Sequence, residues 1–180
     1  MEATTELDAA ICSRLLSPTD PAERAWRISQ RAGVGRYLVA ARDLSAGEVV
    51  FSERPIVVAS PDPSGERAMR GEMAAVAIEL LKQPAGSPAH LLQEADFSQD
   101  TDGSSAGSMR SWTLGMLRAL KVQPPMVAAD GSRVACTEEA VSWALGVASV
   151  NVHGAKSPER GVLGLLASMM EHDCSPSTLT

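Results

Sequence analysis

Two short segments of the chain carry residues whose types and spacing suit ligand binding. Near the N-terminus, Gly33, Gly35 and Arg36 form a Gly-x-Gly-Arg turn between two β-prone runs. Glycines there allow positive φ and let a ligand approach the peptide N–H groups, although the same spacing is typical of a tight hairpin turn. Near the C-terminus, residues 170–177 read Met-Glu-His-Asp-Cys-Ser-Pro-Ser. The turn lacks the third glycine of a dinucleotide-binding fingerprint, which excludes that class of site.

The residues that follow the turn make the first segment more distinctive than a Gly-x-Gly turn alone. Residues 38–49 read Leu-Val-Ala-Ala-Arg-Asp-Leu-Ser-Ala-Gly-Glu-Val. In order and type, this run and residues 170–177 resemble the opening and the cofactor segment of the SET domain, in its SET-and-MYND-like variety of protein-lysine methyltransferases. The resemblance covers roughly residues 24–60 and 137–178. It implies an α+β, SET-like fold of short curved sheets with a helical insertion, and a protein or peptide substrate that bears lysine.

The resemblance also implies a cofactor, S-adenosylmethionine. Gly33, Gly35 and Arg36 would bind it, with the arginine facing the methionine carboxylate, and His172 and Asn151 would complete the pocket. Glu171 stands where the family has an asparagine, and its carboxylate would repel that of the cofactor unless Arg36 intervenes. No catalytic residue is assigned.

The family shapes its lysine channel with a tyrosine that follows the His-Cys-Pro segment. Tyr37 is the one tyrosine of this chain and lies elsewhere. The resemblance therefore implies a C-terminally truncated domain whose closing segment is incomplete and which is inactive by itself. Two alternatives stay open: a catalytically inactive SET-like module that binds a protein partner or the cofactor, and an unrelated α+β interaction domain.

The histidine and cysteines of the second segment have other interpretations. His172 could be a hydrogen-bonded histidine at the end of a helix over 158–170. With Cys174 and Cys136 it could also supply metal ligands, but no Cys-x-x-Cys pair is present. The cysteine-rich MYND finger has no counterpart either. We expect no metal, no zinc included, and a buried thiol at Cys174.

Composition limits the class of protein. The 180 residues carry a net charge of −6, with 44% hydrophobic and 21% charged residues, as in one folded domain. Three widely spaced cysteines fit a reducing compartment, and no leader or membrane span is evident. We expect an intracellular protein, cytoplasmic or nuclear, that contacts no membrane and no nucleic acid directly. The mild acidic excess could favour a basic peptide or could only promote solubility.

Periodicity predicts the elements that must position these segments. Residues 1–23 form an N-terminal helical segment, and the SET-like domain spans 24–180. Within it, 24–60 carries strands (49–51 among them), 61–136 is a mainly helical insertion, and 137–180 is the cofactor-segment half. Helices are expected over 69–82, from 109 to 120, from Glu138 with Thr137 as cap, and over 158–170, with a polar loop over 98–108.

Overall fold

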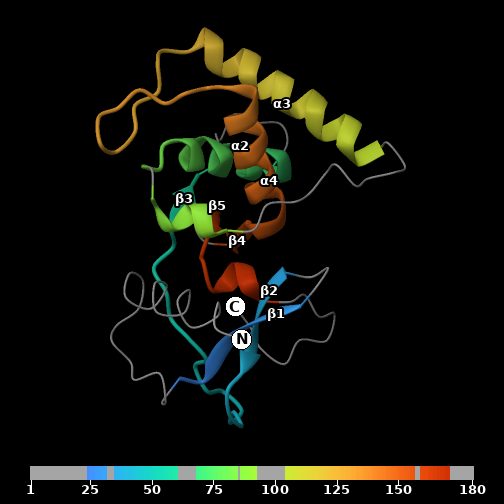
Figure 1. Ribbon diagram of the computed structural model, residues 1–180, viewed down its shortest axis with the longest axis vertical. Coiled ribbons are helices and arrows are strands. Elements are labelled where there is room, and N and C mark those ends of the chain that lie inside the picture. Colours follow the sequence, from blue (N-terminus) through green and yellow to red (C-terminus); the bar gives the residue numbers. More distant parts are fainter. Residues whose placement is uncertain are drawn as a thin grey trace. The chain divides into compact units, whose positions relative to one another are not determined.

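The computed structural model of the 180-residue chain describes residues 24–31, 35–60, 68–84, 86–92, 104–156 and 159–170. The chain divides into two compact units. Unit 1 comprises Met1–Pro55 and Gly164–Thr180, and unit 2 comprises Ile56–Leu163. Within the described residues the chain has three α-helices and two small antiparallel sheets, which confirms the mixed α+β class (Figure 1).

Unit 1 contains a β-hairpin and a short helical turn. Strand β1 (Trp26–Arg31) pairs antiparallel with β2 (Gly35–Ala40), and the register runs from Trp26 opposite Ala40 to Arg31 opposite Gly35. Trp26 and Ile28 are 5% and 4% exposed, so one face of the hairpin is buried. The 3₁₀ turn η4 (Ala167–Met169) lies near the end of the described chain. This hairpin confirms the strands expected around the Gly-x-Gly turn.

Unit 2 is a small sheet with helices. Strands β3 (Val57–Ala59), β5 (Glu159–Leu163) and β4 (His153–Lys156) form an antiparallel sheet in the order β3-β5-β4. Helix α2 (Ala68–Leu81) packs on β3 and β5, and helix α4 (Glu138–Asn151) contacts both α2 and α3 (Ser104–Val122). The 3₁₀ turn η2 (Pro88–Leu91) follows α2.

Helix α4 follows its sequence pattern closely. The Thr137 hydroxyl accepts a hydrogen bond from the Ala140 N–H at 3.1 Å, which satisfies one of the unpaired donors of the first turn. Val141, Leu145 and Ala148 are fully buried, as their spacing predicts. The helix therefore supplies the central apolar face of unit 2.

Three expectations are wrong. The helix expected over 158–170 is absent, because residues 159–163 form β5 at the centre of the sheet and only 167–169 are helical. Residues 49–51 form no strand, and Val49 is 75% exposed. Residues 104–108 belong to α3 rather than to a loop. The expected N-terminal helical segment, residues 1–23, lies outside the described residues.

The two ends of unit 2 meet. The N–H of Ile56 donates to the carbonyl of Leu163 at 2.7 Å. Val57 lies opposite Leu163 in the β3–β5 pair, so the pairing begins at the residue next to the unit's first. The chain thus enters and leaves unit 2 through neighbouring backbone segments.

Candidate functional site

Arg36 lies on the buried face of the hairpin. Directly opposed residues of an antiparallel pair share a face, and side chains alternate along each strand. Arg36, opposite Gln30, is therefore on the same side as Ile28, Leu38 and Trp26. Its guanidinium is half-buried, and desolvation lowers its pKa. A cation in such a place gains more from a nearby anion than one in open solvent.

Gly35 lies at the turn end of β2 with φ of +87°. That conformation is costly for residues with a Cβ, so the turn needs glycine there. The hairpin-turn interpretation of the Gly-x-Gly spacing is confirmed by the pairing of Arg31 with Gly35. Gly33 lies outside the described residues. Gly35 and Arg36 are the two expected cofactor-binding residues that unit 1 places side by side.

A glutamate links the two motif-bearing parts of unit 1. The Glu53 carboxylate accepts hydrogen bonds from the backbone N–H groups of Leu166, at 3.0 Å, and Ala167, at 2.8 Å. These donors start η4, which has no side-chain cap of its own. Glu53 thereby satisfies two N–H groups that the turn leaves unpaired. The turn ends at Met169, directly before the Met-Glu-His-Asp-Cys-Ser-Pro-Ser segment of the sequence.

The space around this contact is filled. A Cβ added at Gly164 would fall 2.8 Å from the Glu53 Cδ and closer still to its Oε1. The Ser168 hydroxyl also donates to the carbonyl of Gly164. The sequence analysis did not identify Glu53. Its one signal is that a carboxylate follows a β-prone run just before Pro55, which many exposed glutamates share.

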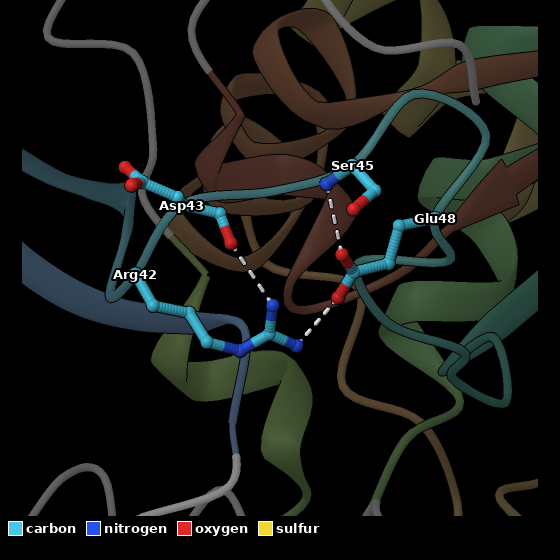
Figure 2. A network of polar contacts seen from close by, with 4 residues as sticks. All are labelled: Arg42, Asp43, Ser45 and Glu48. Atoms are coloured by element: carbon cyan, nitrogen blue, oxygen red, sulfur yellow. Dashed lines mark hydrogen bonds and ion pairs between the residues drawn. The ribbon is translucent and has the colours of Figure 1, made fainter.

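Between β2 and Glu53 the chain makes a turn fixed by an ion pair (Figure 2). Arg42 donates to the Glu48 carboxylate at 2.5 Å and to the carbonyl of Asp43 at 3.0 Å. The second carboxylate oxygen of Glu48 accepts from the Ser45 N–H at 3.0 Å, and Gly47 has φ of +82°. The Arg42 hydrogen bond, followed by the Ser45 N–H, lowers the pKa of Glu48. The network shapes the turn and leaves both charged groups in solvent contact.

Asn151 belongs to unit 2, at the C-terminal end of α4. It is buried, and its side-chain amide donates to the Val147 carbonyl at 2.7 Å, one helical turn earlier. A buried side-chain amide needs such a partner, and here the partner is a carbonyl of the same helix. The structure thus gives Asn151 a role within α4, and its assignment to the cofactor pocket rests on the resemblance.

Glu171, His172 and Cys174 lie outside the described residues. The expected alternative for His172, a cap on a helix over 158–170, loses its basis because residues 159–163 form β5 and only 167–169 are helical. Cys136 is half-buried, with its sulfur 4.0 Å from the Val134 carbonyl. In the part of the chain that the structure describes, no cluster of three or more His, Cys, Asp or Glu side chains is arranged to hold a metal ion.

Comparison of the chain with models of protein families finds no match. Neither the curated proteins nor the solved structures give one. Among the helices of the described residues, none has the length and apolar content of a membrane span. The candidate site of unit 1 is therefore argued from its own residues: a positive-φ glycine, a half-buried arginine and a carboxylate that ties two distant segments together.

Proposed function

We propose that the chain is a SET-like domain of the protein-lysine methyltransferase type and that its unit 1 binds S-adenosylmethionine. The observation that supports this most is the contact of Glu53 with Leu166 and Ala167. It connects the segment that follows the Gly-x-Gly turn with the segment that leads into His172. A site built from both segments needs such a link, because 113 residues separate Glu53 from Leu166.

The residues of the hairpin suit the methionine end of this cofactor. The carboxylate of the cofactor is an anion, and Arg36 is a half-buried cation whose pKa burial lowers. Contact with a carboxylate would offset the free-energy cost of desolvating this cation. The positive φ of Gly35 gives the adjacent backbone room to approach a ligand. The resemblance adds three further residues of unit 1 to this proposal, Gly33, Glu171 and His172.

When bound, S-adenosylmethionine supplies an electrophilic methyl group that a neutral lysine amine can take in line. The role of this chain's residues is to bind and orient the cofactor, since such transfers depend chiefly on alignment. The partner is a protein or peptide that presents a lysine. No residue of the chain is assigned to the transfer step, and the proposal for these 180 residues is cofactor binding.

The test is calorimetric titration of the chain with S-adenosylmethionine and with S-adenosylhomocysteine. We expect binding, and we expect Arg36→Met to weaken it about tenfold, the scale of one charge-assisted contact. Arg27→Met is the matched control, because Arg27 is exposed on the opposite face of the same hairpin. It should leave the affinity unchanged.

Two outcomes would refute the proposal. One is the absence of binding by a chain whose circular dichroism and cooperative unfolding show it to be folded. The other is an equal loss of affinity in Arg36→Met and Arg27→Met, which would mean that any nearby positive charge suffices. The first outcome would favour the protein-interaction hypothesis, and the second would remove Arg36 from the proposed site.

A further inference from the structure

The β1–β2 hairpin concentrates positive charge in a chain that is acidic overall. Residues 24–42 contain five arginines and no aspartate or glutamate, whereas the chain carries a net charge of −6. Arg42 is bound to Glu48, and Arg36 lies on the buried face. The outer face of the hairpin, defined here as Arg27, Ser29, Arg31, Tyr37 and Val39, carries two of the remaining arginines. Both are exposed.

Cross-strand packing orients one of these arginines. The Arg31 guanidinium lies 5.1 Å from the centre of the Tyr37 ring. An arginine held over an aromatic ring is restrained in position and keeps its positive charge. Arg27 is on the same face four residues earlier, which places the two Cα atoms about 14 Å apart along an extended strand. Ser29, a small residue, separates them.

The outer edge of β1 has backbone groups available for pairing. Ala41 donates to the Ala25 carbonyl at 3.0 Å, so that pair is hydrogen-bonded. Hydrogen-bonded and non-hydrogen-bonded pairs alternate in an antiparallel ladder, so the N–H and C=O groups of Ile28 and Gln30 point away from β2. Within the described residues, β1 pairs with β2 alone. An edge of this kind is a template for a further strand.

We infer that the outer edge of β1 binds an acidic peptide in extended conformation, with carboxylates on alternate residues that face Arg27 and Arg31. Side chains of an added strand alternate between faces, so acidic residues at every second position would all lie on the arginine side. A nucleic acid is less suited, because the one aromatic ring of this face is covered by Arg31 and the net charge of the chain repels phosphates. This surface lies on the face of the hairpin opposite to that of Arg36.

The test uses the full chain and two fluorescent octapeptides of the same composition. One alternates threonine and glutamate, and the other places the glutamates in adjacent pairs. Anisotropy is measured at low ionic strength, where exposed charge pairs are least screened. We expect the alternating peptide to bind several-fold more tightly than its isomer, because the paired glutamates place half of the carboxylates on the wrong face.

Charge reversal identifies the surface. Arg27→Glu with Arg31→Glu should weaken binding of the alternating peptide about tenfold. The matched control is Arg110→Glu with Arg118→Glu, two exposed arginines of α3 that make the same change in net charge. It should change the affinity less than twofold. The single variant Arg27→Glu keeps the contact of Arg31 with Tyr37. It tests the same surface if the double variant does not fold.

A backbone variant separates edge pairing from simple attraction. Gln30→Pro removes an N–H that points away from β2 and leaves every charge in place. It should therefore lower the affinity for the alternating peptide to that for the isomer. The inference is overturned if neither peptide binds, if both bind equally, or if the α3 variant loses as much affinity. It is also overturned if an oligothymidylate binds more tightly than the peptide with the same dependence on Arg27.

Discussion

The carboxylate of Glu53 and the backbone N–H of Ala167 form a 2.8 Å hydrogen bond between residues 114 positions apart. The other carboxylate oxygen accepts a hydrogen bond from the N–H of Leu166. Both donors belong to the start of a turn with no cap of its own, so a distant side chain does what a local serine or aspartate does elsewhere. This contact stabilises the end of the described chain.

Replacing Glu53 tests the contact. We expect Glu53→Gln to lower the free energy of unfolding by about 1–3 kcal/mol, because the amide retains one acceptor and loses the charge. Amide hydrogen exchange should accelerate at Leu166 and Ala167. Glu139→Gln, at an exposed glutamate in the first turn of α4, is the control and should leave those two amides unchanged. Unaltered exchange in Glu53→Gln would contradict the contact.

Gly164 offers a complementary perturbation. A Cβ there would displace the Glu53 carboxylate from the N–H groups of Leu166 and Ala167, so Gly164→Ala should destabilise the chain by about 1–3 kcal/mol. The loss should shrink when Glu53 is also changed to alanine, since the colliding atoms are then absent. Urea unfolding of the two single variants and the double variant measures this coupling. Strict additivity of the two losses would mean that the residues do not meet.

The turn of Figure 2 predicts a pH effect. The hydrogen bonds from Arg42 and Ser45 lower the pKa of Glu48 below its ordinary value of about 4.3. A depressed carboxyl pKa means that the stabilisation is complete above pH ~4.3 and is lost as the pH falls through the lower folded value. In an NMR titration, Arg42→Gln should raise the Glu48 midpoint, and Arg54→Gln should not. Equal midpoints in the native chain and in Arg42→Gln would contradict the pair.

Two glycines of unit 2 should respond in opposite directions to alanine. A Cβ at Gly161 in β5 would lie 2.7 Å from Val76 Cγ2 of α2, so Gly161→Ala should cost about 1–3 kcal/mol. Val76→Ala should recover part of that loss. Gly115 in α3 has nothing within 4 Å, and Gly115→Ala should stabilise by about 0.5–1 kcal/mol. Thermal unfolding measures both, and a loss of stability in Gly115→Ala would count against α3 as described.

Glu171 gives a prediction about the proposed cofactor. In the proposed site, Glu171→Asn would remove a negative charge near the methionine carboxylate, so S-adenosylmethionine should bind about threefold to tenfold more tightly. Calorimetry measures the change, with Glu139→Gln as a control for net charge. Unchanged or weaker affinity would place the cofactor elsewhere.

Local patterns predicted the elements that depend on local chemistry. The Gly-x-Gly turn predicted the β1–β2 hairpin, and Thr137 predicted the start of α4. The helix expected over 69–82 is α2, with Val76, Ala77 and Leu80 buried. In each case the periodicity and the end signal agree, so no distant contact had to decide the outcome.

The elements that were missed depend on tertiary partners. The apolar run 162–166 is too short to distinguish a buried strand from a helix, and pairing with both β3 and β4 makes 159–163 a strand. Gly161 and Gly164 were a signal against a helix there. Val49-Val50-Phe51 has high β propensity but pairs with no strand in the described chain. Glu53 could not be found from sequence, because its partners are backbone N–H groups more than a hundred residues away.

The hydrogen bond between Ile56 and Leu163 has a consequence for how this chain tolerates change. Because the first and last residues of unit 2 are held together, the chain enters and leaves that unit at neighbouring positions. Lengthening or shortening the loops of unit 2 leaves this hydrogen bond as it was. Unit 2 thus has the topology of an inserted module. Its loops can change in length without changing the contact of Glu53 with Leu166 and Ala167.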